Sequence, residues 1–140
     1  MYLSLQGNIG LGRAIEYFTS KCIPISLPLN DTQSYDLIAD FNGGLQRIQV
    51  KTTRYTETEG KSYAVQLRNC GGNRTGKARA IAFDNTSCDY LFVYTGANKM
   101  YLIPSKEITA TNTITVGIKY TEYEVYSNTL KEFLESNLEG

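Results

Sequence analysis

Hydrophobic and polar residues alternate along positions 35–53, on both sides of an Asn-Gly-Gly sequence at 42–44. Alternation with a period of two is typical of β-strands that bury one face, and Asn-Gly favours a two-residue hairpin turn. The pattern therefore predicts an antiparallel hairpin with one polar and one apolar face. The polar face contains Asp36, Asp40, Arg47, Gln49 and Lys51, and the apolar face contains Leu37, Ala39, Phe41, Ile48 and Val50.

The position of the turn decides which residues of the two strands face each other. A loop of Asn42-Gly43 places Asp36 opposite Gln49, whereas a loop one residue later places Asp36 opposite Lys51. In either register a carboxylate, an amide and a lysine lie on one polar patch in front of an apolar layer. Such a patch is a candidate site for metal-dependent hydrolysis of phosphodiesters.

The remaining periodicity predicts further elements around this hairpin. A first helix is expected over residues 8–22, with Asn8 as its N-cap and an apolar stripe at spacings of four, three and four. The stripe consists of Leu11, Ile15, Phe18 and Cys22. Extended segments are expected at 23–29 (an edge, because of two prolines), 62–69, 90–95 with 99–103, and 114–118. A closing helix over 127–138 would present Leu130, Phe133, Leu134 and Leu138 on one side. These elements predict a single α/β (α+β) domain over residues 1–140, with a mixed sheet flanked by an N-terminal and a C-terminal helix.

The composition narrows the chemistry of the polar patch. The chain contains no histidine, which excludes Ser-His and Cys-His nucleophilic sites and histidine metal ligands. Carboxylates with a hard divalent cation remain for phosphate hydrolysis, and we expect Mg²⁺. Apolar runs are all shorter than the roughly 18 residues of a membrane span, so we expect an intracellular, cytoplasmic protein without a membrane partner. Cys22, Cys70 and Cys88 have no paired spacing and are expected to be reduced thiols.

Charge is distributed unevenly along a chain whose net charge is zero. Residues 47–79 hold eight basic and two acidic residues, whereas 1–46 hold two basic and four acidic and 80–140 hold four basic and eight acidic. A basic zone that follows the polar patch directly is typical of a protein that contacts a phosphate backbone. The residues expected to contact DNA are Arg54, Lys61, Arg68, Asn69, Asn73, Arg74, Lys77 and Arg79.

Four segments, in this order, resemble the PD-(D/E)XK nucleases, over roughly residues 7 to 105. They are Gly7-Asn8-Ile9-Gly10, Tyr35-Asp36-Leu37, Gln49-Val50-Lys51-Thr52 and Tyr101-Leu102-Ile103-Pro104. The motif of the family is an Asp near a strand end followed by (Asp/Glu)-x-Lys on the neighbouring strand, and Gln in place of the second acid is a known variant. The branch that the flanking segments resemble contains small bacterial nucleases, including a group I intron homing endonuclease.

This resemblance implies a restriction-endonuclease-like fold and a role for each residue of the motif. Asp36, the side-chain oxygen of Gln49 and the backbone carbonyl of Val50 would hold Mg²⁺ or another divalent cation. Lys51 would orient and help to deprotonate the attacking water, or stabilise charge that builds on the phosphorane.

Position 11 departs from the branch, which has a metal-site glutamate on the first helix where this chain has Leu11. Glu16 does not replace it. Five residues along a helix correspond to a rotation of about 500°, so the side chain of Glu16 points about 140° away from that of position 11. We expect Glu16 to be solvated. Two explanations of Leu11 are open at this point. Natural divergence would leave fewer ligands, and a deliberate substitution would disable cleavage.

The sequence therefore predicts a sequence-specific DNA endonuclease of the intron-homing kind, with double-stranded, pseudo-palindromic DNA as its substrate. Because one site cuts one strand, a homo-oligomer is expected, as a dimer or a dimer of dimers. The alternatives are a structure-specific nuclease for junctions or repair, and a non-catalytic DNA-binding module on a decayed nuclease fold. A small β-rich protein-interaction domain is a further alternative, in which the basic zone is incidental.

Overall fold

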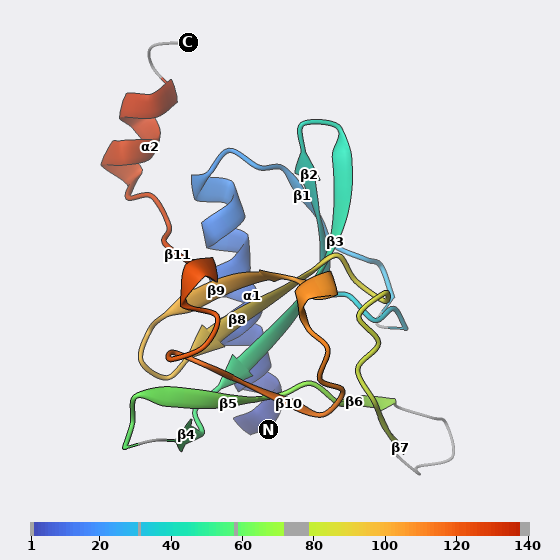
Figure 1. The fold of residues 1–140 in the computed structure, drawn as a ribbon. Coiled ribbons are helices and arrows are strands. Elements are labelled where there is room, and N and C mark those ends of the chain that lie inside the picture. The colour runs from blue at the N-terminus through green and yellow to red at the C-terminus, as the bar shows by residue number, and fades with distance from the viewer. Residues whose placement is uncertain (1, 31, 58, 72–78, 138–140) are drawn as a thin grey trace.

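A computed structural model describes residues 2–30, 32–57, 59–71 and 79–137 of the chain (Figure 1). The helices are α1 (Tyr2–Ser20) and α2 (Leu130–Asn137), with 3-10 turns at Ser105–Glu107 (η1) and Thr121–Tyr123 (η2). The strands are β1 (Ile25–Ser26), β2 (Leu37–Phe41), β3 (Gly44–Thr53), β4 (Thr56–Glu57), β5 (Ser62–Gln66), β6 (Asn69–Gly71), β7 (Arg79–Ile81), β8 (Tyr90–Thr95), β9 (Met100–Pro104), β10 (Thr113–Val116) and β11 (Glu124–Val125). None of the described helices is long and apolar enough to cross a membrane.

The described strands form a central mixed sheet in the order β1-β2-β3-β8-β9-β11. Its middle pair, β3 and β8, is parallel, and the other pairs are antiparallel. A second sheet has the order β10-β5-β4, and β6 pairs with β7 in a short ribbon. The mixed sheet with its two helices confirms the predicted fold class.

Two apolar clusters lie on opposite faces of the central sheet, because alternate residues of each strand point to opposite sides. One face of β8 contributes Phe92 to a cluster that α1 covers with Ala14, Tyr17 and Phe18. The other face contributes Leu91 and Val93 to a cluster completed by β5 and β10. The central sheet is therefore packed between a helix and a smaller sheet, and Figure 1 shows α1 behind the strands.

The hairpin of β2 and β3 has the first of the two predicted registers. Phe41 pairs with Gly44 and Leu37 pairs with Ile48, so Asn42-Gly43 is the loop. Both loop residues have positive φ, 53° for Asn42 and 90° for Gly43, as a type I′ turn requires. Continuing this register by one residue places Asp36 opposite Gln49.

Helix α1 begins at Tyr2, so the prediction that it starts at Asn8 is wrong. Residues 2–7 contain no proline and continue the helix toward the N-terminus, which leaves Asn8 exposed in its interior. The predicted stripe is correct for Leu11, Ile15 and Phe18, which pack on the sheet. Cys22 is exposed and lies beyond the end of the helix, in the left-handed conformation with φ of 60°. This conformation belongs to a Schellman cap, in which the N–H of Ile23 donates to the carbonyl of Phe18 at 2.9 Å.

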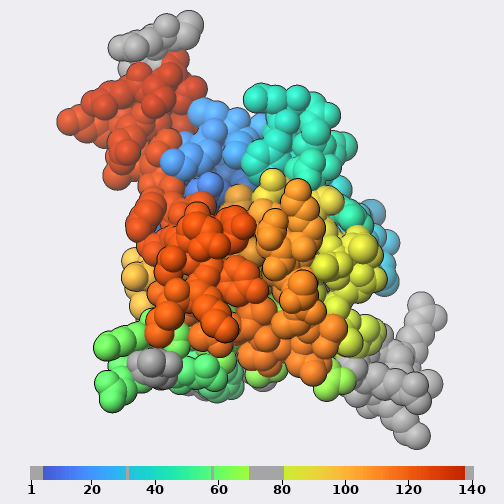
Figure 2. Space-filling model, in the orientation of Figure 1, coloured from blue at the N-terminus to red at the C-terminus, as the bar shows by residue number. Residues whose placement is uncertain are grey.

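The short helix α2 begins at Leu130, three residues after the predicted start, and none of its described residues is buried. Two hydrogen bonds join α2 and the segment before it to the residues that follow α1. Lys21 Nζ donates to Asn128 Oδ1 at 2.9 Å, and Cys22 Sγ donates to Asn137 Oδ1 at 3.2 Å. In the space-filling view, α2 forms a lobe that stands out from the rest of the molecule (Figure 2). Leu138, the last residue of the predicted apolar side, lies outside the described residues.

Candidate active site

Asp36 is fixed at the end of the β2–β3 ladder by two bonds to β3. Its N–H donates to the carbonyl of Ile48 at 2.8 Å, and its Oδ2 accepts from the N–H of Val50 at 2.7 Å. The residue is exposed, yet enough protein surrounds the carboxyl group to displace water from it. This desolvation raises the pKa of Asp36, against the hydrogen bond from Val50 and the charge of Lys51, which lower it.

Gln49 and Lys51 point away from α1, on the face of β3 that the smaller sheet covers. The side-chain oxygen of Asn69, on β6, accepts from both of them, from Gln49 Nε2 at 2.9 Å and from Lys51 Nζ at 2.7 Å. Gln49 is only 4% exposed. The three side chains therefore form a hydrogen-bonded group beside Asp36.

Buried polar atoms continue from Gln49 into the core. Cys88 Sγ lies 4.0 Å from Gln49 Oε1 and 3.1 Å from Ser105 Oγ. Cys88 and Ser105 are almost fully buried. Desolvation raises the pKa of the Cys88 thiol, so this group is a neutral S–H donor at pH 7. Gln49 thus presents its nitrogen to Asn69 and its oxygen to the protein interior. Cys22 and Cys88 are free thiols, as predicted, and the side chain of Cys70 lies outside the described residues.

The atoms around Asp36 suit a hard divalent cation bound through few protein ligands. In a strand, the N–H and C=O of one residue face the same neighbour. Because Val50 N–H bonds Asp36 Oδ2, the Val50 carbonyl points to the same side of β3 as the Asp36 carboxylate. Mg²⁺ is commonly bound by one or two carboxylates, with water and substrate phosphate completing its shell. Gln49 Oε1, the third predicted ligand, is directed to Cys88 in this arrangement.

The side chain of Leu11 belongs to the apolar cluster between α1 and the sheet, where it is partly buried. Within the described part of the chain, no group of three His, Cys, Asp or Glu residues is arranged to hold a metal ion. Glu16 is exposed and bonds Arg13 at 3.2 Å, as expected for a solvated residue. Asp36 is therefore the one acid that the motif segments contribute.

The predicted DNA-contacting residues divide into three groups. Arg54, Lys61 and Arg68 are exposed on segments next to β4 and β5, and Figure 1 shows these strands along one edge, near the carboxyl end of β3. Asn69 is turned into the site, and Arg79 is the first residue of β7. Asn73, Arg74 and Lys77 lie outside the described residues.

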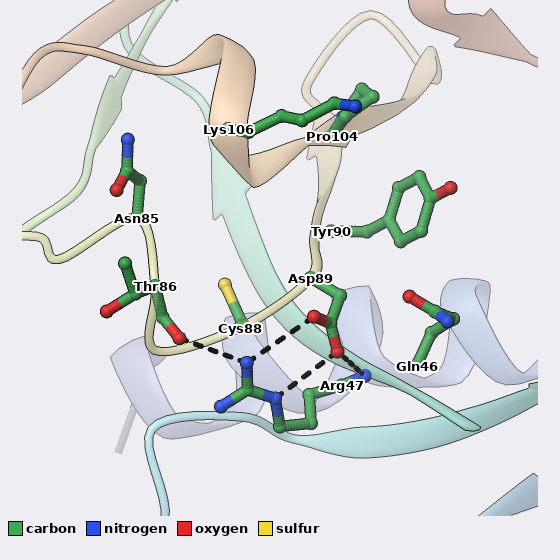
Figure 3. A pocket seen from close by; sticks show the side chains of 9 residues that line it. All are labelled: Gln46, Arg47, Asn85, Thr86, Cys88, Asp89, Tyr90, Pro104 and Lys106. Carbon is green, nitrogen blue, oxygen red and sulfur yellow. Dashed lines mark hydrogen bonds and ion pairs between the residues drawn. The ribbon is translucent and has the colours of Figure 1, made fainter. Parts of the chain in front are cut away.

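Arg47, in the amino-terminal half of β3, forms an ion pair with Asp89 (Figure 3). Its Nε lies 3.2 Å from Asp89 Oδ2, and its guanidinium also donates to the carbonyls of Thr86 and Ser87. The hydrogen bond from Arg47 lowers the pKa of Asp89. Arg47, Thr86 and Asp89 line a cleft of about 380 Å³ that also includes Cys88. Asp36 and Lys51 are not among its lining residues.

Comparison with known proteins identifies the class of protein to which this chain belongs. The sequence model of a family described as PD-(D/E)XK endonuclease matches residues 2–132. The chain belongs to this family, which confirms the resemblance predicted from the motif segments. Enzymes of this family generally use divalent metal ions.

A bacterial homing endonuclease, I-Ssp6803I, is similar in structure and sequence. The TM-score is 0.68 and the identity 27%, over 81% of this chain and 76% of that chain. No curated protein sequence matches the chain.

Proposed function

We propose that this protein is a DNA endonuclease that hydrolyses phosphodiester bonds with a divalent cation, Mg²⁺ in particular, at Asp36 and Lys51. The observation that supports the proposal most is the arrangement of these two residues. The Asp36 carboxylate is fixed by Val50 N–H and lies close enough to the Lys51 ammonium for the charge of Lys51 to oppose the rise in the pKa of Asp36 that desolvation causes. Membership of the PD-(D/E)XK endonuclease family supports the same chemistry.

Each group of the site has a distinct task in this reaction. A divalent cation bound at Asp36 and the Val50 carbonyl would polarise the phosphate and make water more acidic. Asp36 would hold that cation, while its hydrogen bond from Val50 N–H keeps the carboxylate in place. The Lys51 ammonium is a positive donor beside the carboxylate, so it can orient the attacking water and stabilise charge on the phosphate oxygens in the transition state.

Double-stranded DNA fits the surface beside the site. Arg54, Lys61 and Arg68 extend the positive charge from the carboxyl end of β3 along β4 and β5. The likeness to a bacterial homing endonuclease supports sequence-specific cleavage of the intron-homing kind. An intracellular location fits such a substrate.

A homo-oligomer, as a dimer or a dimer of dimers, would allow a pair of sites to cut both strands of a pseudo-palindromic target. Helix α2 supports this part of the proposal, because Leu130 and Leu134 are exposed on a helix without buried residues. The molar mass in solution, measured by light scattering with and without Leu130→Lys, tests the assembly separately from cleavage.

The function is tested by sequencing new DNA ends after incubation of a bacterial genomic DNA library with the protein and Mg²⁺. We expect ends at a defined sequence, and no ends with Asp36→Asn or Lys51→Ala. Because desolvation raises the pKa of Asp36, its ionised form costs folding free energy at neutral pH, and Asp36→Asn removes that cost. Asp36→Asn is therefore expected to remain folded, and cleavage by both variants at the wild-type rate would refute the proposed site.

A non-catalytic DNA-binding module is the second candidate function, and Leu11 is the observation that favours it. Side-by-side cleavage by this chain and by Leu11→Glu separates the two. Cleavage by Leu11→Glu alone would mean that Leu11 disables a nuclease. Equal cleavage by both would mean that Asp36 and Lys51 suffice, and tight DNA binding without cleavage by either would favour the binding module.

A further inference from the structure

The hydrogen bonds around Asn69 have a direction that the chemistry of Lys51 decides. A protonated lysine has only donors, so the atom of Asn69 that faces Lys51 Nζ at 2.7 Å is its oxygen. The same oxygen lies 2.9 Å from Gln49, which must therefore turn its NH₂ group toward Asn69. Gln49 Oε1 is left facing the Cys88 thiol. One cation thus sets the orientation of two neighbouring amides.

The backbone explains why Asn69 faces the site when the residue before it faces solvent. Val65, Leu67 and Asn69 follow one another at a period of two, and the first two are buried in the cluster beneath β5. Gln66 and Arg68, between them, are exposed. The N–H of Leu67 donates to Asn112 at 2.8 Å and holds this strand segment against the chain that precedes β10. Asn69 therefore reaches Gln49 and Lys51 from a segment anchored in the core.

We propose that Asn69 is a positioning residue for the nuclease reaction, which holds the Lys51 ammonium and the Gln49 amide in place through one side-chain oxygen. The inference rests on the proposed function. It assigns Asn69 to the hydrolytic step and removes it from the set of residues that contact DNA. A lysine has a flexible four-carbon stem, and a fixed acceptor reduces the number of positions its charge occupies. Residues that orient site groups in this way commonly change activity by about 10- to 100-fold when they are removed.

The kinetic test compares single-turnover cleavage with DNA binding in the metal-free protein. For Asn69→Ala we expect a cleavage rate about 10- to 100-fold lower and a Kd for DNA within about twofold of wild type. Asn69→Asp keeps an oxygen acceptor at the same place and is expected to recover more activity than Asn69→Ala. Asn112→Ala, at an exposed asparagine whose backbone carbonyl accepts from Leu67, is the matched control and should change neither quantity. A loss of DNA affinity with an unchanged cleavage rate in Asn69→Ala would overturn the inference, since it would make Asn69 a DNA contact.

A second measurement does not depend on nuclease activity, so it tests the role of Asn69 even if the protein does not cut DNA. The side-chain NH₂ of Gln49, assigned by its disappearance in Gln49→Leu, is expected to exchange its hydrogens with water slowly in the wild-type protein and in Asn112→Ala. Exchange should become markedly faster in Asn69→Ala. Equal exchange in the wild-type protein and Asn69→Ala would overturn the role of Asn69. Absence of cleavage with slow, Asn69-dependent exchange would overturn the proposed function alone and leave the side-chain arrangement supported.

Discussion

The contact between α1 and β3 depends on one glycine, and replacing it gives a sharp test of how the site is supported. A Cβ placed on Gly10 would lie 1.8 Å from Thr52 Oγ1 and 3.4 Å from Val50 Cγ1. A side chain at position 10 therefore requires rotation of Thr52 or a shift of the helix or of the strand that carries Lys51. Rotation of Thr52 moves Oγ1 away, but it leaves Thr52 Cβ at 3.2 Å and turns the γ-methyl group or the hydrogen of Cβ toward the new side chain.

The expected change in the free energy of unfolding for Gly10→Ala is the sum of two opposing contributions. Overpacking of a close contact costs about 1–3 kcal/mol, and an overlap as severe as 1.8 Å places Gly10→Ala near the upper end. Alanine in place of glycine inside a helix returns about 1 kcal/mol. We therefore expect Gly10→Ala to lower the free energy of unfolding by about 2 kcal/mol, or the Tm by about 4–8 °C.

The same helix supplies matched controls. Cβ atoms on Gly7 and Gly12 would meet nothing within 4 Å. Gly7→Ala and Gly12→Ala are therefore expected to raise the free energy of unfolding by about 0.5–1 kcal/mol each, through helix propensity alone. Urea unfolding followed by circular dichroism measures all three variants under the same conditions.

A second substitution separates packing from propensity. Thr52→Ala removes the clashing hydroxyl, which is buried without a hydrogen-bond partner among the described residues, and leaves Cβ at 3.2 Å from the new methyl group. The double variant should be more stable than the sum of the single changes by up to about 3 kcal/mol, which is the overpacking term. Stabilisation by Gly10→Ala to the same degree as by Gly7→Ala would refute the close packing of α1 on β3.

Two further predictions concern parts of the fold away from β3. The hydrogen bond from Arg47 lowers the pKa of Asp89. The ionised carboxylate therefore stabilises the fold fully at pH values above the ordinary aspartate pKa of about 4. This stabilisation is lost as the pH falls through the lowered pKa of Asp89 in the folded protein. Wild type should be more stable than Asp89→Asn by about 0.5–1 kcal/mol at pH 7, and a difference in unfolding free energy that does not shrink below pH 4 would contradict this reasoning. Thr129 and Glu132 bond each other's backbone N–H groups at 3.1 Å, which is a capping box for α2. Thr129→Ala should weaken α2 by about 1 kcal/mol, seen as faster amide hydrogen exchange in α2 with an unchanged Tm, whereas a lower Tm would mean that α2 unfolds together with the sheet.

The hairpin and its polar face could be predicted because the information is local. The alternation of residues 35–53 sets which side chains share a face, and Asn-Gly tolerates the left-handed conformations of the turn. The choice between the two registers required the structure, since Asn42-Gly43 and the next pair both suit a tight turn. The family match extends over residues 2–132 and supports the motif reading well beyond the hairpin.

Helix α1 and Asn69 show where local patterns were insufficient. Asn8 is a good N-cap residue, but residues 2–7 contain no proline, and Gly7 inside the helix costs only about 1 kcal/mol relative to alanine, which does not stop the helix there. Asn69 stands in the sequence beside the basic residues that are predicted to contact DNA, although its spacing of two from Leu67 and four from Val65 indicates an inward-facing position. Its bonds to Gln49 and Lys51 join residues about 20 positions apart, and no local pattern encodes such a contact.

The parallel pairing of β3 with β8 has a consequence for how the chain folds and diversifies. Parallel neighbours need a long crossover, usually a helix, but here the chain between Thr53 and Tyr90 includes the β4, β5, β6 and β7 strands. The middle of the central sheet can therefore close only after a distant segment returns to it, a topology that slows folding. The same excursion contains most of the basic zone, so insertions or replacements within it can alter what the molecule recognises while the registry of β3 on β8 stays unchanged.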